Sequence, residues 1–424
     1  MKYDVVIVGV GLAGLTAGLR LAQAGKRVLL LAKGVGGTHL GGSAIDVLGY
    51  RPERVEHPLA ELPDFLAAHQ QHPYARAGLP ALRAAADWFL KLTEQLGYPF
   101  TGSLEDNYLL PTAIGTAKPS ALVPQSMAAG DLRGGGQFAI VGFRNLKDFF
   151  PALLADNLSR AHAGQSDQAT LTARAELLDP PGLTEPDLPP LDLARAFDRA
   201  DFRAAIAAEL RPRLKPGERV GFPAMLGLRE PLAAWQDLQA RLGAPVFEIP
   251  GLPPSVPGIR LYERLKNALS AAGARLQIGF PVTEASLAGG QCQELVTSGA
   301  SRPYRWSGER VVLATGGIAS GGIQTESDGA VREPIFNLPL AGVPADDTPR
   351  FRPAYFDSHP FSQVGLEVDG CLRPVDAAGR APIANVHAIG AMLAHAEPWR
   401  EGSGNGISLA TGYRVSQVLL EEKP

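Results

Sequence analysis

Residues 3–14 read YDVVIVGVGLAG, an apolar run that passes directly into the glycine spacing G-x-G-x-x-G. A continuous run of valine and isoleucine is typical of a parallel strand that is buried on both faces. Gly9 permits a sharp turn, Gly11 lets a pyrophosphate approach the backbone, and Gly14 allows close packing of the next helix on the strand. A helix over residues 12–24 then directs its N–H groups and positive dipole end toward the phosphate. The stretch predicts a nucleotide-binding Rossmann unit; a tight turn without a ligand is the alternative.

Length and composition describe an ordinary globular protein. The 424 residues, 45% of them hydrophobic and 20% charged, suffice for two or three domains or for one discontinuous domain with a large insertion. A net charge of −3 gives no electrostatic reason to expect nucleic acid as a partner. No apolar run reaches the roughly 20 residues that a membrane-spanning helix needs. Two isolated cysteines, Cys292 and Cys371, are too few for an iron–sulfur cluster and fit a reducing cytoplasm. We predict no metal site.

A glycine-rich loop follows the second predicted strand, residues 27–31. It covers residues 34–46 (GVGGTHLGGSAID) and can lie flat against a ligand, because missing side chains let the backbone approach. Gly41, Gly42 and Ser43 are its candidate ligand contacts. Residues 51–100 read as mainly helical.

Residues 140–250 read as a second α/β unit. Its predicted strands cover residues 138–143, 170–175, 219–226 and 246–249, and an amphipathic helix is predicted over 191–210. A nucleotide-domain pattern returns after Pro257, with a helix, a strand and a hairpin about residues 288–291.

Two more glycine turns follow strands near the end of the chain. Residues 310–317 (RVVLATGG) end a buried strand at Gly316, and residues 386–390 (VHAIG) end another at Gly390. Gly404, Asn405 and Gly406 then begin a helix and would present its first N–H groups. Three unrelated glycine turns are the alternative to a single site.

The order of these turns resembles flavoproteins of the glutathione-reductase-like fold, in which the last helix points its N-terminus at the flavin pyrimidine. We therefore predict an α/β fold with a discontinuous Rossmann-like FAD/NAD(P)-binding domain and an inserted α/β cap or substrate domain. Residues 1–50, 255–320 and 370–424 form the first; residues 51–254 and 321–369 form the second, for substrate or partner docking.

Nearly the whole chain resembles the B subunit of anaerobic glycerol-3-phosphate dehydrogenases. The stretches that carry the resemblance include residues 72–74 (HPY), 141–149 (VGFRNLKDF), 321–334 and, most specifically, 252–261 (LPPSVPGIRL). The resemblance implies a subunit with non-covalent FMN that pairs with a catalytic A subunit, while an iron–sulfur C subunit passes electrons to membrane quinone. It implies oxidation of sn-glycerol 3-phosphate to dihydroxyacetone phosphate, with fumarate or nitrate as terminal acceptor. The chain itself is expected in the cytoplasm, at the inner face of the membrane only through a partner.

Two positions depart from the usual dinucleotide pattern. Asp or Glu normally ends the second strand and binds the adenosine ribose, but Ala32 and Lys33 stand there. Related flavoproteins place Asp after the late A-I-G, where this chain has Ala391. The glycine fingerprint favours FAD while the resemblance implies FMN, so FMN, FAD held by backbone alone, and a site without flavin stay open.

Oxidation of a secondary alcohol needs a hydride acceptor, a base and cations for the phosphate. We name His359 and Arg332 as the catalytic candidates, since guanidinium groups suit phosphate. A structural histidine and an arginine paired with a nearby carboxylate are the alternatives. Further candidates are His39, Arg260, Arg352, His395 and Glu397.

Two other functions remain open. One is a self-sufficient flavin oxidoreductase on another small anionic substrate. The other is a non-catalytic subunit that relays electrons or docks partners, which the missing acid at Ala32 favours.

Overall fold

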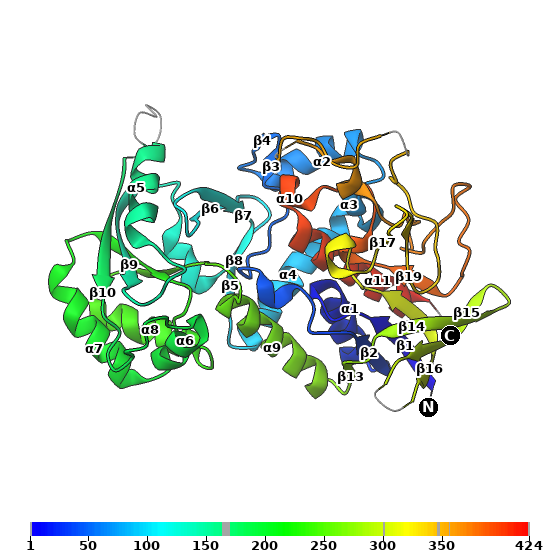
Figure 1. Ribbon diagram of the computed structural model, residues 1–424, viewed down its shortest axis with the longest axis horizontal. Helices are drawn as coiled ribbons and strands as arrows, with labels where there is room; N and C mark the ends of the chain where they lie inside the picture. Colours follow the sequence, from blue (N-terminus) through cyan, green and yellow to red (C-terminus); the bar gives the residue numbers. More distant parts are fainter. Residues whose placement is uncertain (1, 163–169, 300–301, 346–347, 356, 423–424) are drawn as a thin grey trace.

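The computed structural model describes residues 2–162, 170–299, 302–345, 348–355 and 357–422, and these form two lobes (Figure 1). One lobe is built around a large mixed sheet, the other around a four-stranded sheet. Each has its own apolar core. The predicted α/β class, with a second α/β unit inserted in the nucleotide-binding one, is confirmed.

The opening sequence forms the middle of the large sheet. In order, its strands are β13 (Arg275–Ile278), β2 (Val28–Ala32), β1 (Lys2–Val8), β16 (Tyr304–Leu313), β15 (Gln291–Thr297) and β14 (Val282–Ala288), with β19 (Val386–Ala388) also beside β16. β1 pairs in parallel with both β2 and β16, and its last four residues are almost fully buried. A parallel strand with neighbours on both sides explains the continuous apolar run. β14 and β15 form the predicted hairpin.

Three long helices pack together in this lobe: α1 (Leu12–Gln23), α9 (Val256–Ala271) and α11 (Gly404–Glu421). α11 packs closely on α1, because a Cβ at Gly412 would lie 2.6 Å from the carbonyl oxygen of Ala13. Any side chain there would push the two helices apart. The opening helix and the last helix of the described chain are therefore direct neighbours.

The predicted helical segment after residue 51 also belongs to this lobe. It forms α2 (Pro58–Ala68), α3 (Pro73–Ala77) and α4 (Leu79–Gln95), and buried side chains such as Leu62 and Phe89 lie in the first core. The second core begins at Leu109. The cores thus divide the chain near residue 105, whereas we placed the domain boundary at residue 51. Helical spacing of apolar residues shows that one face is buried but not what covers it.

The second lobe is a parallel sheet with helices packed on it. Its strands lie in the order β10 (Leu171–Leu178), β9 (Gly136–Phe143), β11 (Glu218–Pro223) and β12 (Val246–Ile249). All three pairings are parallel, so each connection must cross over the sheet. The helices of this lobe are α5 (Pro151–His162), α6 (Pro190–Phe197), α7 (Ala200–Leu210) and α8 (Pro231–Leu242).

The single helix predicted over residues 191–210 is wrong, because the chain breaks between α6 and α7. Asp198 lies at the break and accepts hydrogen bonds from the backbone N–H groups of Leu228, Arg229 and Glu230. Its carboxylate thus fixes the loop before α8, a tertiary contact that helical periodicity cannot reveal.

Short elements complete the fold. The hairpins or paired strands are β3 (Tyr50–Arg51) with β4 (Glu53–Arg54), β5 (Phe100–Gly102) with β8 (Leu122–Pro124), β6 (Tyr108–Pro111) with β7 (Ala117–Ser120), and β17 (Gln324–Thr325) with β18 (Val331–Arg332). The short helical turns are η1 (Thr38–Leu40), η2 (Gln125–Gly130), η3 (Arg211–Arg213), η4 (Ile318–Ser320), η5 (Pro360–Gln363), η6 (Gly390–Met392) and α10 (Pro398–Glu401). Across the described residues, we find no helix whose length and hydropathy would let it cross a bilayer.

A buried ion pair joins the two lobes. Arg260 on α9 is 2% exposed, and its two terminal nitrogens lie 2.8 and 3.1 Å from the carboxylate oxygens of Glu248 on β12. Its Nε donates to the carbonyl oxygen of Gly227. Glu248 also accepts from the Ser126 hydroxyl and from the N–H of Leu226. Arg260 is therefore not available to a substrate phosphate, and that sequence-based assignment is wrong.

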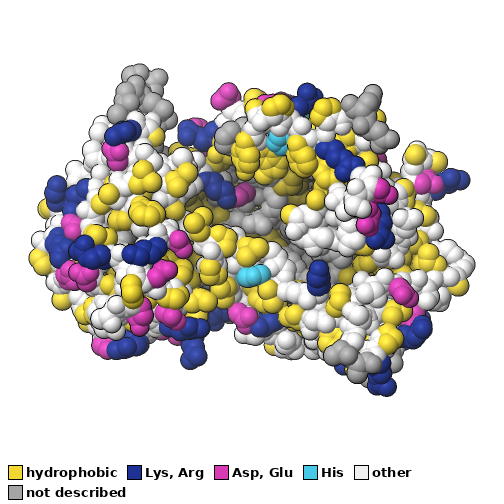
Figure 2. All heavy atoms as spheres, in the orientation of Figure 1, with side chains coloured by type: hydrophobic (Ala, Val, Ile, Leu, Met, Phe, Trp, Pro, Cys, Tyr) yellow, Lys and Arg dark blue, Asp and Glu magenta, His cyan; other side chains and the backbone are white. Residues whose placement is uncertain are grey.

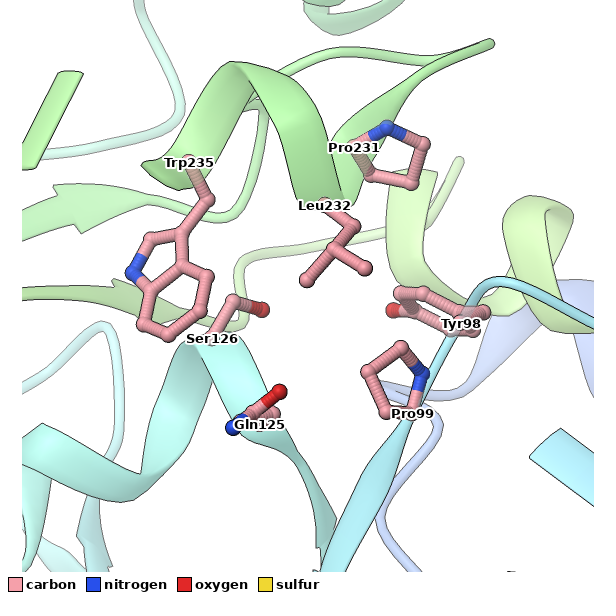
Figure 3. A pocket seen from close by; sticks show the side chains of 7 residues that line it. All are labelled: Tyr98, Pro99, Gln125, Ser126, Pro231, Leu232 and Trp235. Atoms are coloured by element: carbon pink, nitrogen blue, oxygen red, sulfur yellow. The ribbon is translucent and has the colours of Figure 1, made fainter. Parts of the chain in front are cut away.

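The seam beside this pair is closely packed. A small pocket there has room for about 10 Å³ (Figure 3), roughly what a single water molecule requires. It is lined by Tyr98, Pro99, Gln125, Ser126, Pro231, Leu232 and Trp235. Burial raises the pKa of the Tyr98 hydroxyl to about 12, so this phenol stays neutral. The pocket is too small to hold a substrate.

Replacement of Arg260 by Ala is expected to lower the free energy of unfolding by about 3–5 kcal/mol, because it leaves the Glu248 carboxylate buried without its partner. Urea unfolding followed by fluorescence measures the loss. Arg264→Ala, one helical turn further along α9, removes only a bond to the Arg229 carbonyl and serves as the control. Equal losses in both variants would contradict this account. The double replacement of Glu248 and Arg260 by Leu should cost less than Arg260→Ala.

Candidate functional site

The first two glycine turns lie against each other at the ends of β1 and β16. A Cβ at Gly9, whose φ is +116°, would lie 2.1 Å from the carbonyl oxygen of Ala314. A Cβ at Gly316, with φ +78°, would lie 2.6 Å from the side chain of Ser320. One at Gly317 would lie 2.6 Å from the carbonyl oxygen of Ala391. The turn after β16 therefore touches both the first turn and the third.

The third turn is held on the last helix. The N–H of Gly390 donates to the Thr411 hydroxyl at 2.9 Å, and that hydroxyl donates to the carbonyl oxygen of Ile407. A Cβ at Gly390 would lie 3.0 Å from Cβ of Ala13 and 3.8 Å from Oγ of Ser408. All three turns therefore meet in one place. Ser408, a half-buried hydroxyl on the first turns of α11, is a contact that the sequence analysis missed.

The three glycines of the first motif have the steric environments that their expected roles require. Nothing lies within 4 Å of the Cβ position of Gly11, so the space beside it is open. A Cβ at Gly14 would lie 2.3 Å from the carbonyl oxygen of Gly9, which only glycine avoids. α1 starts after Gly11 with no side-chain cap and no acidic residue in its first turn. Its first N–H groups are suited to a phosphate.

The glycine-rich loop after β2 packs on this helix start. A Cβ at Gly36 would lie 2.9 Å from the backbone nitrogen of Gly11, whereas Gly34, Gly37 and Gly41 have nothing within 4 Å of their Cβ positions. Lys33 is exposed at the end of β2. Its ammonium has no ion-pair partner in the part of the chain that the structure describes. The loop therefore offers bare backbone and one cation beside the phosphate position.

The loop also has unused hydrogen-bonding capacity. Thr38 Oγ1 and His39 Nδ1 are buried and have no hydrogen-bond partner among the described residues. Ser43 is 3% exposed, has a positive φ of 71° and lies beside Tyr98. A Cβ at Gly42 would lie 2.9 Å from the Pro250 side chain.

The LPPSVPGIRL segment clamps the same loop. Ser255 caps α9 by accepting from the N–H of Gly258, and its hydroxyl donates to the carbonyl oxygen of Gly41 at 2.7 Å. A Cβ at Gly258 would lie 2.6 Å from the same oxygen. The start of α9 thus fixes the loop against the opening motif, which explains why serine and glycine occur at this spacing.

The start of α11 presents fewer N–H groups than predicted. The N–H of Gly406 donates to the Asp46 carbonyl oxygen at 2.9 Å, so Gly406 is not available to a ligand through that group. The Asn405 side chain donates to the Ala44 carbonyl oxygen at 2.8 Å. The backbone N–H groups of Gly404 and Asn405 remain, and no side chain caps the helix. Gly406 contributes close packing, since its Cβ would lie 2.1 Å from the Tyr74 hydroxyl.

A buried carboxylate lies directly before this helix. Glu401 accepts hydrogen bonds from His72 Nε2 at 3.2 Å, from the Ser403 hydroxyl at 2.6 Å and from the N–H of Glu397 at 2.8 Å. Burial would raise the pKa of Glu401, but the hydrogen bonds from His72, Glu397 and Ser403 together hold it below the ordinary value. Tyr74, from the same HPY motif, has its hydroxyl 2.8 Å from the Val47 carbonyl oxygen. The motif therefore packs against the site rather than within an inserted domain.

The two predicted catalytic residues lie on segments away from the glycine turns. His359 Nδ1 accepts from the N–H of Arg352, its Nε2 lies 3.1 Å from the Tyr355 carbonyl oxygen, and its ring stacks on Trp399. Arg332 is exposed and pairs with Glu326 at 2.7 Å. These contacts suit structural roles, and a catalytic role for either residue stays a prediction.

Other polar candidates form a second network. Glu397 is 8% exposed, accepts from the Ser358 hydroxyl and pairs with Arg400. His395 lies 3.4 Å from Glu367 and has a φ of +67°. Figure 2 shows the molecular surface hollowed between the two lobes, above α9 in this view.

Gly11→Ala and Gly14→Ala are expected to have opposite effects. Gly11 has extended backbone (φ −69°, ψ 179°) and open space, so Ala should leave stability unchanged and weaken binding of the predicted flavin at least about tenfold, or ~1.4 kcal/mol. Gly14→Ala should destabilise the fold by about 1–3 kcal/mol through overpacking. Flavin titration and thermal unfolding measure the two effects. A Gly11→Ala variant that binds flavin normally would contradict the assigned phosphate position.

Glu401→Gln is expected to destabilise the protein by about 1–3 kcal/mol at neutral pH, because three hydrogen bonds to the carboxylate are weakened. The pKa of Glu401 is lowered in the folded state, so its contribution is fully present above the ordinary value of 4.5 and is lost as pH falls through the folded pKa. The difference in unfolding temperature between wild type and variant should therefore shrink below about pH 4.5. A difference that stays constant down to pH 3 would contradict this assignment.

Comparison with known proteins agrees with this geometry. The model of the FAD binding domain family matches residues 4–407. The chain is 35% identical to the probable B subunit of the anaerobic glycerol-3-phosphate dehydrogenase of Halobacterium salinarum, over 99% of this chain and 98% of that protein. It is 32% identical to the corresponding B subunit of Pectobacterium carotovorum, over 100% of this chain and 99% of that protein. Among solved structures, the 3-ketosteroid-delta4-(5alpha)-dehydrogenase of Rhodococcus jostii aligns with 99% of this chain and 97% of its own, at 13% identity and a TM-score of 0.42.

The site fits the cofactor that the family model names. An open Gly11, uncapped starts of α1 and α11, and a loop with spare hydrogen-bonding groups can hold a non-covalent flavin through its phosphates and its ring. The matched family, together with full-length similarity to the curated relatives, identifies the chain as a flavin-dependent oxidoreductase that belongs to the FAD binding domain family and, within it, to the family of anaerobic glycerol-3-phosphate dehydrogenase B subunits.

Proposed function

We propose that this chain takes part in the oxidation of sn-glycerol 3-phosphate to dihydroxyacetone phosphate. The observation that carries the proposal is its similarity, from end to end, to relatives named for that activity, combined with a preserved nucleotide cradle. A shared name alone would not require the cradle to be intact. An open Gly11 and bare helix starts support a working cofactor site.

In this proposal, the chain's residues bind and orient the cofactor and stabilise charge. The bound flavin supplies the acceptor for the substrate hydride. The first turn of α1 holds the pyrophosphate of FAD, and Lys33 stands nearby. The N–H groups of Gly404 and Asn405 face the ring, where negative charge develops on reduction. Because the cradle is a pyrophosphate site, we expect FAD rather than FMN.

The catalytic assignments follow from the contacts of each residue. Nδ1 of His359 accepts a backbone hydrogen bond, so its ring is the neutral tautomer with the proton on Nε2. It can take the hydroxyl proton of the substrate only when the Arg352 N–H releases Nδ1. Arg332 can bind the substrate phosphate only by exchanging its Glu326 partner. We keep both as proposed catalytic residues.

The proposed assembly contains a catalytic A subunit together with an iron–sulfur C subunit that transfers electrons to membrane quinone, with fumarate or nitrate as terminal acceptor. Support comes from the curated relatives, which are all named as the B subunit of a larger enzyme. In this assembly, the chain is cytoplasmic and reaches the inner face of the membrane through its partners.

A second candidate is an electron-relay subunit that binds flavin but does not touch the substrate. The observation that favours it is the engagement of both catalytic candidates by the protein itself: both nitrogens of His359 contact backbone, and Arg332 is ion-paired. In that case, only the A subunit would oxidise the substrate.

Purified protein is expected to show flavin absorbance, and chromatography of the released cofactor is expected to identify FAD. Anaerobic addition of glycerol 3-phosphate should bleach the flavin of the isolated chain. Glycerol 1-phosphate, the enantiomer, is the matched control and should leave it oxidised. Bleaching that needs the A subunit would exclude direct oxidation by this chain and would favour the relay.

A further inference from the structure

The HPY motif makes contacts that flavin binding as described does not explain. His72 is 1% exposed and Tyr74 is fully buried, both at the start of α3. His72 reaches Glu401, and the Tyr74 hydroxyl lies 2.8 and 3.2 Å from the carbonyl oxygens of Val47 and Ser403. The motif thus connects α3 with both segments that flank the start of α11.

The hydrogen bonds of His72 define its protonation. Its Nδ1 accepts from the N–H of Tyr74 at 3.1 Å and so carries no proton. The ring proton therefore lies on Nε2 and is donated to the carboxylate of Glu401 at 3.2 Å. His72 is a neutral donor with two separate tasks: one nitrogen caps α3, and the other orients Glu401.

Glu401 in turn determines what Ser403 does. A serine at the N-cap of a helix normally accepts from a backbone N–H in the first turn. The Ser403 side chain makes no such cap and donates to Glu401 at 2.6 Å instead. Ser403 is fully buried, so its hydroxyl is held in this direction. The N–H groups of Gly404 and Asn405 therefore receive no hydrogen bond from the Ser403 side chain.

We propose that His72 and Glu401 are positioning residues for the flavin, which hold Ser403 away from its own helix so that the first N–H groups of α11 remain free for the cofactor ring. The proposal rests on a flavin at this helix start and does not depend on which substrate is oxidised. Uncapped N–H groups stabilise the anionic reduced ring more than the neutral oxidised ring. Loss of the positioning therefore lowers the midpoint potential of the flavin.

Two substitutions of His72 separate its two tasks. His72→Asn keeps an oxygen near the position of Nδ1, so it can still cap α3, but it cannot reach Glu401. His72→Gln keeps a donor near the position of Nε2, so it still reaches Glu401 but loses the cap. His69→Gln, three residues earlier, is the control, because His69 contacts the carbonyl oxygen of Phe65 and not Glu401.

The midpoint potential of the bound flavin and the dissociation constants of both its redox states are measured in the isolated full-length chain. His72→Asn should weaken binding of reduced flavin about tenfold more than that of oxidised flavin, which lowers a two-electron potential by about 30 mV. His72→Gln and His69→Gln should keep the wild-type potential, whatever their unfolding temperatures. Tyr74→Phe, which removes the hydroxyl contact with Ser403, should shift the potential in the same direction as His72→Asn and covers the case in which that variant fails to fold.

Equal potentials in His72→Asn, Tyr74→Phe and wild type would overturn the proposal, as would equal shifts in His72→Asn and His72→Gln. A wild-type chain that takes up no flavin would also overturn it. If glycerol 3-phosphate fails to reduce the flavin while the shift in His72→Asn is present, the proposed substrate is wrong and the positioning role stands.

Discussion

The site depends on backbone segments that approach one another more closely than any side chain allows. Gly9 lies on the carbonyl group of Ala314, Gly258 lies on that of Gly41, and Gly412 lies on that of Ala13. These contacts come from residues spread over most of the chain. A methyl group at any one would separate strand from strand, clamp from loop or helix from helix. Close packing of main chain, rather than a set of polar side chains, therefore shapes the flavin cradle.

Two buried carboxylates organise the regions around that cradle. Glu248 accepts from Arg260, Ser126 and Leu226 and fixes one lobe on the other. Glu401 accepts from three donors and fixes the segment before α11. In both cases the cost of burying a charge is offset by several donors at once, which is the condition under which buried charges persist. The lobe seam and the helix start are thus defined by geometry as well as by apolar packing.

The sequence predicted those parts of the molecule whose signals are local. The β1 run, the roles of Gly9, Gly11 and Gly14, and the β14–β15 hairpin follow from neighbouring residues, and the structure places them accordingly. Partners set by tertiary folding were out of reach. Glu401 is 329 residues from His72, and Asp198 breaks a helix by binding a loop 30 residues away. Arg260 has the same appearance in sequence whether it binds phosphate or a buried carboxylate.

The position of α11 has a consequence for how the protein is made. The opening motif lies at residues 9–14, yet the helix start that faces the cofactor ring is formed by residues 403–405, and α9, which clamps the loop, begins at residue 256. During synthesis on the ribosome, a nascent chain therefore carries a phosphate-binding turn long before it carries a complete cradle. Incorporation of the cofactor must wait until translation is nearly finished, so a yellow molecule is one whose synthesis reached α11.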